Sequence, residues 1–137
     1  MVLNSIIECE AGDDCVLLRT HDEAKILVLH RAPASPYSDN LTFELEAGSP
    51  TVRGKGPFQI SVEQVTRFID EYEEVSKAEL QDVNGDGTIT FDKIDLIGHV
   101  RVTIQLGGPW SNQARIAFDT DQTALTSFAE DLRSFLE

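Results

Sequence analysis

The sequence lacks the residue patterns that most enzymes use. It has no Cys-x-x-Cys pair, no group of cysteines and histidines at zinc-ligand spacing, and no serine in a nucleophile elbow. The glycines of "RGKG" do not lie between a strand and a helix, so they are not expected to hold a phosphate. Because no nucleophile, base and oxyanion site can be assembled from these residues, we expect no catalytic activity and name no catalytic residue.

Segments that would cross a membrane or direct export are also missing. Nowhere do ~18 apolar residues run together, and the first residues carry no positive charge. These features predict a cytoplasmic protein with no membrane partner. Cys9 and Cys15 flank a predicted turn, so a disulfide across a hairpin is geometrically conceivable. In the cytoplasm we expect both thiols to be reduced.

Basic residues are scarce, and acidic residues are abundant. The 137 residues include 24 Asp and Glu against 11 Lys and Arg, which gives a net charge of −13. Such a surface repels nucleic acid and anionic membranes, and it favours basic partners or cations. A well-solvated surface with no partner would explain the same charge. The length fits one domain, residues 1–137, with a core of its own.

Alternation of apolar and polar residues predicts mainly antiparallel strands. It is clearest in "HVRVTIQL" (99–106), and "KILVLHR" (25–31) is apolar on both faces, as in a covered central strand. Two segments, 61–77 and 122–136, instead have the period of amphipathic helices, and Ser61 with Gln64 forms a capping-box start. We predict an α+β fold in which an antiparallel sheet of about seven to nine hairpin-connected strands carries both helices on one face.

The segment "DVNGDGTITFDK" (82–93) has two interpretations. It resembles an EF-hand calcium loop, but Lys93 stands where a bidentate glutamate should complete the coordination. Alternation on both sides predicts instead a hairpin that places Ala78, Leu80, Ile89 and Phe91 on one face. We favour the hairpin, with no metal site and no cofactor. The alternative is a weak calcium loop formed by Asp82, Asn84, Asp86 and Thr88.

Several segments of the second half occur in a distinctive order. They are "VEQVTRFIDEYEEV", "DGTITF", "GHVRVTIQL", an aromatic turn, and "FDTDQTALTSFAEDLRSFL". This order, over residues 41–137, resembles a group of small bacterial proteins that includes the WapI-type immunity proteins, which are paired with wall-associated polymorphic toxins, and relatives of unknown function. The residues of the shared motifs are expected to be structural: Gly98, His99, Trp110, Asp121, Gln122 and Thr123.

The resemblance implies that the chain binds and neutralises a cognate toxin. Many toxins of that class attack RNA or DNA and are basic, and an acidic inhibitor would suit them. From alternation and charge we predict two contact surfaces: the polar strand face of His99, Arg101 and Gln105, and the helix face of Glu63, Asp70, Glu71 and Glu74. A non-enzymatic protein-binding module is therefore the favoured function. The alternatives are a calcium-stabilised domain and a small-molecule binder.

Overall fold

The computed structural model describes residues 15–19, 26–32, 39–48, 53–107 and 113–136. The elements, in chain order, are β1 (Cys15–Arg19), β2 (Ile26–Arg31), β3 (Leu41–Gly48), β4 (Arg53–Ile60), α1 (Val62–Glu71), β5 (Lys77–Gln81), β6 (Gly87–Lys93), β7 (His99–Leu106), β8 (Ala114–Asp121) and α2 (Gln122–Ser134). Neither described helix is long and apolar enough to span a membrane.

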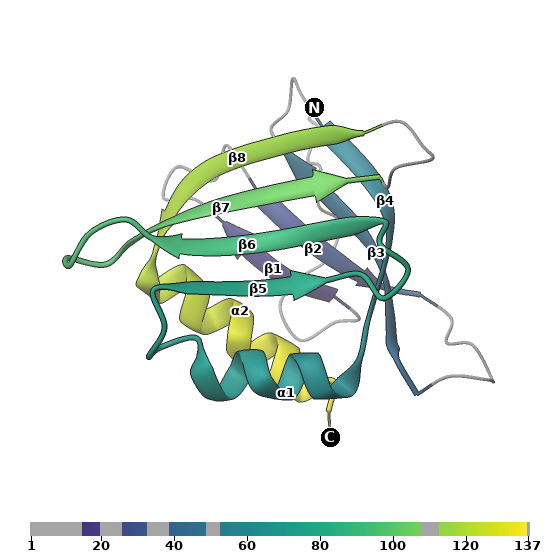
Figure 1. Cartoon of the computed structure of the whole chain (residues 1–137), viewed down its shortest axis with the longest axis horizontal. Coiled ribbons are helices and arrows are strands. Elements are labelled where there is room, and N and C mark those ends of the chain that lie inside the picture. The colour runs from purple at the N-terminus through teal and green to yellow at the C-terminus, as the bar shows by residue number, and fades with distance from the viewer. Residues whose placement is uncertain (1–14, 20–25, 33–38, 49–52, 108–112, 137) are drawn as a thin grey trace, which may run out of the picture.

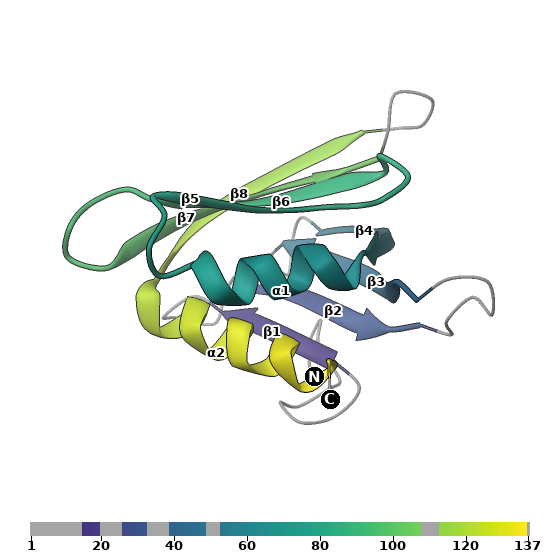
Figure 2. The same cartoon turned by 60° about the horizontal axis from the view of Figure 1, so that its bottom comes forward.

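The strands form two antiparallel sheets, each with its strands in chain order. The first sheet is β1-β2-β3-β4 and the second is β5-β6-β7-β8, and a helix follows each sheet. Figures 1 and 2 show the sheets as two layers, with both helices along one side of them. Each helix contacts an edge strand of the sheet that it does not follow: α1 contacts β5, and α2 contacts β1. The two halves of the chain are therefore interlocked.

The predicted fold class is confirmed, and the arrangement of its layers differs from the prediction. The eight antiparallel strands and two helices agree with the expected α+β composition. The strands make two sheets, however, and the helices do not share one face of a single sheet. Alternation shows which side of a strand is buried, but it does not show which strands belong to the same ladder. Here α1 separates β4 from β5, and the ladder ends there.

The helix boundaries follow from local hydrogen bonds. Ser61 is the N-cap of α1, as predicted, and its hydroxyl accepts the backbone N–H of Gln64. The Gln64 side chain does not close the capping box, because it bonds the backbone N–H and C=O of Gln81 at the edge of β5. The helix ends at Glu71, earlier than the predicted Lys77, since residues 72–75 form turns. Asp121 caps α2 through the N–H of Ala124.

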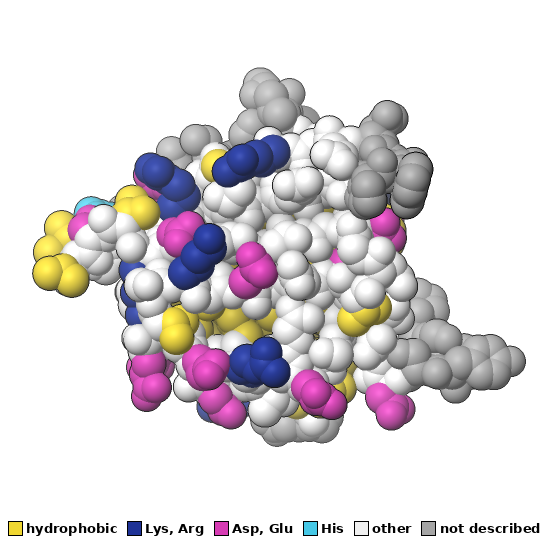
Figure 3. All heavy atoms as spheres, in the orientation of Figure 1, with side chains coloured by type: hydrophobic (Ala, Val, Ile, Leu, Met, Phe, Trp, Pro, Cys, Tyr) yellow, Lys and Arg dark blue, Asp and Glu magenta, His cyan; other side chains and the backbone are white. Residues whose placement is uncertain are grey.

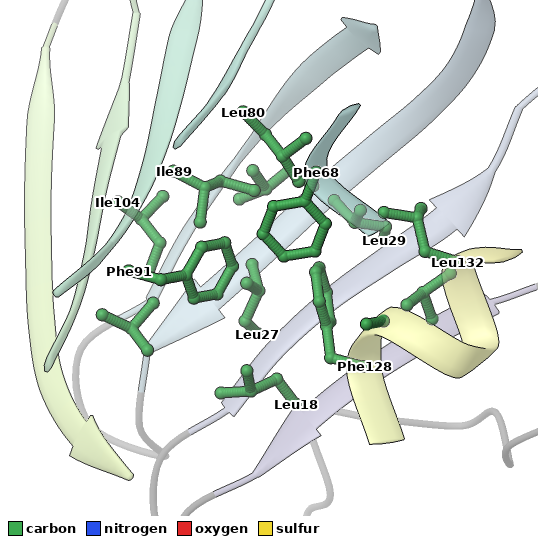
Figure 4. Close-up of a cluster of buried hydrophobic side chains, with 14 of the residues drawn as sticks. Leu18, Leu27, Leu29, Phe68, Leu80, Ile89, Phe91, Ile104, Phe128 and Leu132 are labelled. Carbon is green, nitrogen blue, oxygen red and sulfur yellow. The ribbon is translucent and has the colours of Figure 1, made fainter. Parts of the chain in front are cut away.

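The core fills the space between the two sheets and the two helices. The rings of Phe68 on α1, Phe91 on β6 and Phe128 on α2 have centroids 5.3–6.1 Å apart. Figure 4 shows Leu27 and Leu29 of β2 beside them. Leu27, Val28 and Leu29 of β2 are all fully buried, which confirms the prediction of a strand covered on both faces.

Three expectations concern residues near the edges of the described ranges. Cys15 is buried and disulfide-bonded, so the expectation of a reduced thiol is wrong for this residue. That expectation followed from the expected compartment, which does not determine whether two sulfur atoms lie close together. Cys9 and Trp110 lie outside the described residues.

The aromatic contact makes a prediction about stability. Replacing Phe128, which is fully buried, with alanine leaves a cavity where α1, α2 and the second sheet meet. We expect Phe128→Ala to lower the free energy of unfolding by about 3–5 kcal/mol in urea denaturation. The control Val62→Ala removes a side chain that is 40% exposed, and it should change stability by about 0.5 kcal/mol or less. Equal effects of the two substitutions would contradict this description of the core.

Candidate functional site

The segment 77–93 is a β-hairpin, as predicted. β5 pairs with β6 in antiparallel register, with Ala78 opposite Phe91 and Leu80 opposite Ile89. These four side chains share the inner face, where Leu80, Ile89 and Phe91 are buried and Ala78 packs against the core. Gly85 in the turn has a φ of 79°, a conformation that suits glycine. The residues that resemble a calcium loop therefore form the turn of a hairpin.

Asp82 has a structural role in this turn. Its side chain is buried, and both carboxylate oxygens accept backbone hydrogen bonds. Oδ1 accepts the N–H of Gln59 on β4 at 2.6 Å, and Oδ2 accepts the N–H groups of Asn84 and Asp86 at 2.8 and 3.1 Å. The carboxylate thus joins the hairpin to the end of β4, between the two sheets. Across the described ranges, no three His, Cys, Asp or Glu residues are grouped as metal ligands would be.

The outer face of the second sheet carries paired charges of both signs. His99, Arg101 and Gln105 lie on this face and are exposed, where the sequence placed them. In one row across the strands, Lys77, Asp92, Arg101 and Asp119 lie opposite one another in turn. The guanidinium of Arg101 donates to both carboxylate oxygens of Asp119, at 2.8 and 3.3 Å. Because the signs alternate, each charge in this row has an opposite charge beside it, and Figure 3 shows acidic and basic side chains interspersed on this face.

The acidic face of α1 is a separate surface. Glu63, Asp70, Glu71 and Glu74 are all exposed, and in Figure 3 acidic side chains lie along the lower edge of the view, over α1 and the turn after it. Between α1 and the free edge of β5 is a groove of about 430 Å³, whose lining includes Gln64, Arg67, Glu71 and Glu79. The structure therefore does not merge the two predicted contact surfaces into one patch.

The loop between β6 and β7, residues 94–98, is a feature that the sequence reading missed. Leu96 is 104% exposed, Ile97 is 81% exposed and Ile94 is 43% exposed. Figures 1 and 2 show this loop projecting beyond the end of the second sheet, and Figure 3 shows hydrophobic side chains at its tip. The signal in "KIDLIGH" is a pair of adjacent large apolar residues between two turn-forming residues, Asp95 and Gly98. Adjacent residues of a strand point to opposite faces, so two large apolar neighbours do not fit a pattern in which only one face is buried.

Hydrogen bonds to Asp95 hold this loop in shape. Oδ1 of Asp95 accepts the backbone N–H groups of Ile97 and His99 at 2.9 and 3.1 Å. Oδ2 lies 2.5 Å from Nδ1 of His99, and the N–H of Ile94 donates to the carbonyl of His99 at 3.1 Å. Gly98 has a φ of 101°, and its carbonyl accepts the N–H of Gln122 at 2.7 Å. Gly98 and His99 are therefore held in place by the start of α2 and by β7, and this fixes one end of the loop.

The pair of Asp95 and His99 shifts the pKa of both groups. The hydrogen bond to Asp95 raises the pKa of His99 above 6.5, and the charges of Asp95, Asp119 and Asp121 act in the same direction. The hydrogen bond from His99 lowers the pKa of Asp95 below 3.8, and the backbone donors add to the effect. The imidazolium form of His99 is therefore favoured at the base of the loop.

A comparison with known proteins identifies one family. The model of the Immunity protein WapI-like family matches residues 26–137. The match begins at β2 and includes every later element of the fold, so it extends further toward the N-terminus than the resemblance noted over residues 41–137. No curated protein and no solved structure matches the chain.

The role of Asp82 separates the hairpin from the calcium alternative. We expect Asp82→Ala to lower the free energy of unfolding by about 2 kcal/mol or more, because three backbone N–H groups lose their acceptor. Asp86→Ala is the matched control: it removes another acid of the supposed calcium loop, but the described hydrogen bonds of Asp86 come from its backbone. It should change stability by about 0.5 kcal/mol or less.

The same proteins can be melted in millimolar calcium and in chelator, with identical curves expected for the wild type. A calcium site filled at 100 times its Kd would add about 2.7 kcal/mol. A calcium-dependent gain in stability that both substitutions abolish would contradict the hairpin interpretation.

The Asp95–His99 pair makes a prediction about pH. Stabilisation by charged His99 is fully present below pH 6.5 and is lost as the pH rises through its raised pKa. Stabilisation by Asp95 is present above pH 3.8 and is lost as the pH falls through its lowered pKa. An NMR titration of the imidazole should give a midpoint above 6.5, and Asp95→Asn should lower it. An unchanged midpoint in the variant would show that the carboxylate of Asp95 does not raise the pKa of His99.

Proposed function

The chain belongs to the WapI-like immunity protein family, and we propose that it is a non-enzymatic protein that binds a cognate toxin and neutralises it. The observation that carries this proposal is the match over residues 26–137. It takes in both helices and all strands from β2 to β8, so the family likeness covers the folded core and is not confined to one motif. An immunity protein acts by binding, which supports a role without catalysis.

The net charge of −13 supports a basic toxin as the partner. A strong field of one sign attracts a partner of opposite charge and speeds its association. The acids of the first sheet are partly compensated, because Glu44 lies 3.3 Å from the Lys55 ammonium, and Glu46 lies 3.3 Å from His30. By contrast, within the described part of the chain, Asp70, Glu71 and Glu74 at the end of α1 form no ion pair. Their full charge is available to a partner.

Neutralisation is tested by searching the genes beside that of this chain for a secreted protein with a C-terminal toxin domain, and by co-expressing the chain with that domain. We expect the wild type to restore growth and the purified proteins to associate at a rate that falls as salt is added. The variant Asp70→Asn/Glu71→Gln/Glu74→Gln should associate about tenfold more slowly at low salt, with a flatter salt dependence.

A second triple variant with the same change of net charge is the matched control. It carries Asp39→Asn/Glu44→Gln/Glu130→Gln, and all three of these residues are exposed elsewhere on the molecule. This control should associate faster than the variant at the end of α1. If wild-type protein neither binds the toxin nor restores growth, the proposed function is wrong. If it binds at a rate that ignores salt, the basic toxin is wrong.

A further inference from the structure

The tip of the loop between β6 and β7 presents adjacent large apolar side chains to solvent. Single exposed apolar residues are ordinary on protein surfaces. Leu96 and Ile97, however, are neighbours on a projecting loop, and their side chains are more exposed than those of the other exposed large apolar residues in the described ranges, which are 40–44% exposed. Burial of these two side chains would be favourable, and folding of this chain does not achieve it.

The loop is ordered by contacts that leave its tip exposed. Asp95 accepts the backbone N–H of Ile97 in the loop and that of His99 at the start of β7, its carboxylate pairs with the His99 ring, and Gly98 is bonded to the start of α2. None of these contacts buries Leu96 or Ile97. A loop that is already fixed loses less conformational entropy when a partner covers it, which raises affinity. The arrangement therefore suits a binding element better than a flexible connection.

The acidic end of α1 lies at the same end of the molecule as the loop. Nζ of Lys93, at the end of β6, donates to the carbonyl of Glu73 at 2.5 Å, and its backbone N–H donates to the carbonyl of Ser76 at 2.9 Å. These bonds join the base of the loop to the turn that follows α1. Figure 3 shows the hydrophobic tip at the left, with acidic side chains below it at the same end.

We infer that Leu96 and Ile97 insert into an apolar pocket on the cognate toxin, while Asp70, Glu71 and Glu74 contact a basic rim beside that pocket. This inference rests on the proposed function and specifies the surface that performs it. Charge decides the class of partner, because the chain carries a net charge of −13 and, within the described residues, Asp70, Glu71 and Glu74 beside the loop form no ion pair. An anionic membrane would be repelled by these groups, whereas a basic protein would not.

The test compares two double variants in binding to the same toxin domain that is used to test neutralisation. Leu96→Ser/Ile97→Ser changes only exposed side chains, so its melting temperature should equal that of the wild type. We expect its affinity for the toxin to fall about 30-fold or more, mainly through faster dissociation. The control Val62→Ser/Val83→Ser removes two apolar side chains that are 40% and 44% exposed elsewhere on the molecule, and it should bind like the wild type.

A further pair of variants separates loop shape from direct contact. Asp95→Asn keeps an oxygen for the N–H groups of Ile97 and His99, whereas Asp95→Ala removes it. Asp95→Ala should weaken binding more than Asp95→Asn, although both retain Leu96 and Ile97. Equal affinity of these two variants would show that the order of the loop does not contribute.

The outcomes distinguish this inference from the proposed function. If the wild type binds the toxin and Leu96→Ser/Ile97→Ser binds equally well, the inference is wrong and the proposed function stands. If the wild type does not bind, the proposed function fails, and the inference fails with it. Sedimentation with vesicles of anionic or zwitterionic phospholipid is a third arm. Binding to vesicles that depends on Leu96 and Ile97 would overturn the inference in favour of a membrane surface.

Discussion

The contact among the rings of Phe68, Phe91 and Phe128 joins the two halves of this molecule. Within the described strands, no ladder joins one sheet to the other, so strand pairing does not determine how the two sheets lie relative to each other. The three rings come from α1, β6 and α2, and leucines of β2 pack beside them. Because hydrophobic attraction has no direction, the shapes of the packed side chains must set the position of the layers. Each helix follows one sheet in the chain and contacts an edge strand of the other, so the positions of both sheets depend on this contact.

With the layers set by the core, two aspartates determine the conformation at opposite ends of β6. Both use the same chemistry, a carboxylate that accepts backbone N–H groups. Asp82 is buried and reaches from its turn to β4, so it contributes to the packing of one sheet on the other. Asp95 is exposed and bonds only within its own loop and the start of β7. The first interaction connects the two sheets, and the second orders a loop that lies outside the core.

The sequence predicts the elements better than their assembly. Strict alternation in "HVRVTIQL" predicts β7, and the apolar run of residues 25–31 predicts a strand covered on both sides, since both patterns reflect burial directly. The division into two sheets depends on which strands pair, and alternation carries no such information. Gln64 illustrates the same limit: its spacing from Ser61 suggests a capping box, but a more distant partner, the edge of β5 at Gln81, takes its side chain.

The candidate surface was only half predictable for a related reason. Exposed acids can be recognised from helical periodicity, because charged residues on the polar face of a helix are rarely buried. Leu96 and Ile97 could not be recognised in this way, since a sequence pattern treats every large apolar residue as a core residue. Only the structure shows that they lie outside the core, and that hydrogen bonds keep them there.

Acidic charge and an apolar tip act on different stages of an encounter, which is why their presence at one end of the molecule is informative. Charge acts over about 8–10 Å at physiological salt and mainly raises the rate of association. Apolar burial acts only at contact and mainly slows dissociation, the step through which most interfaces adjust their affinity. A surface with only the acids would bind basic proteins quickly but with little selectivity. In the proposed complex, the side chains of Leu96 and Ile97 would add the requirement for a pocket of matching shape, and a requirement of that kind lets an inhibitor distinguish one partner from another.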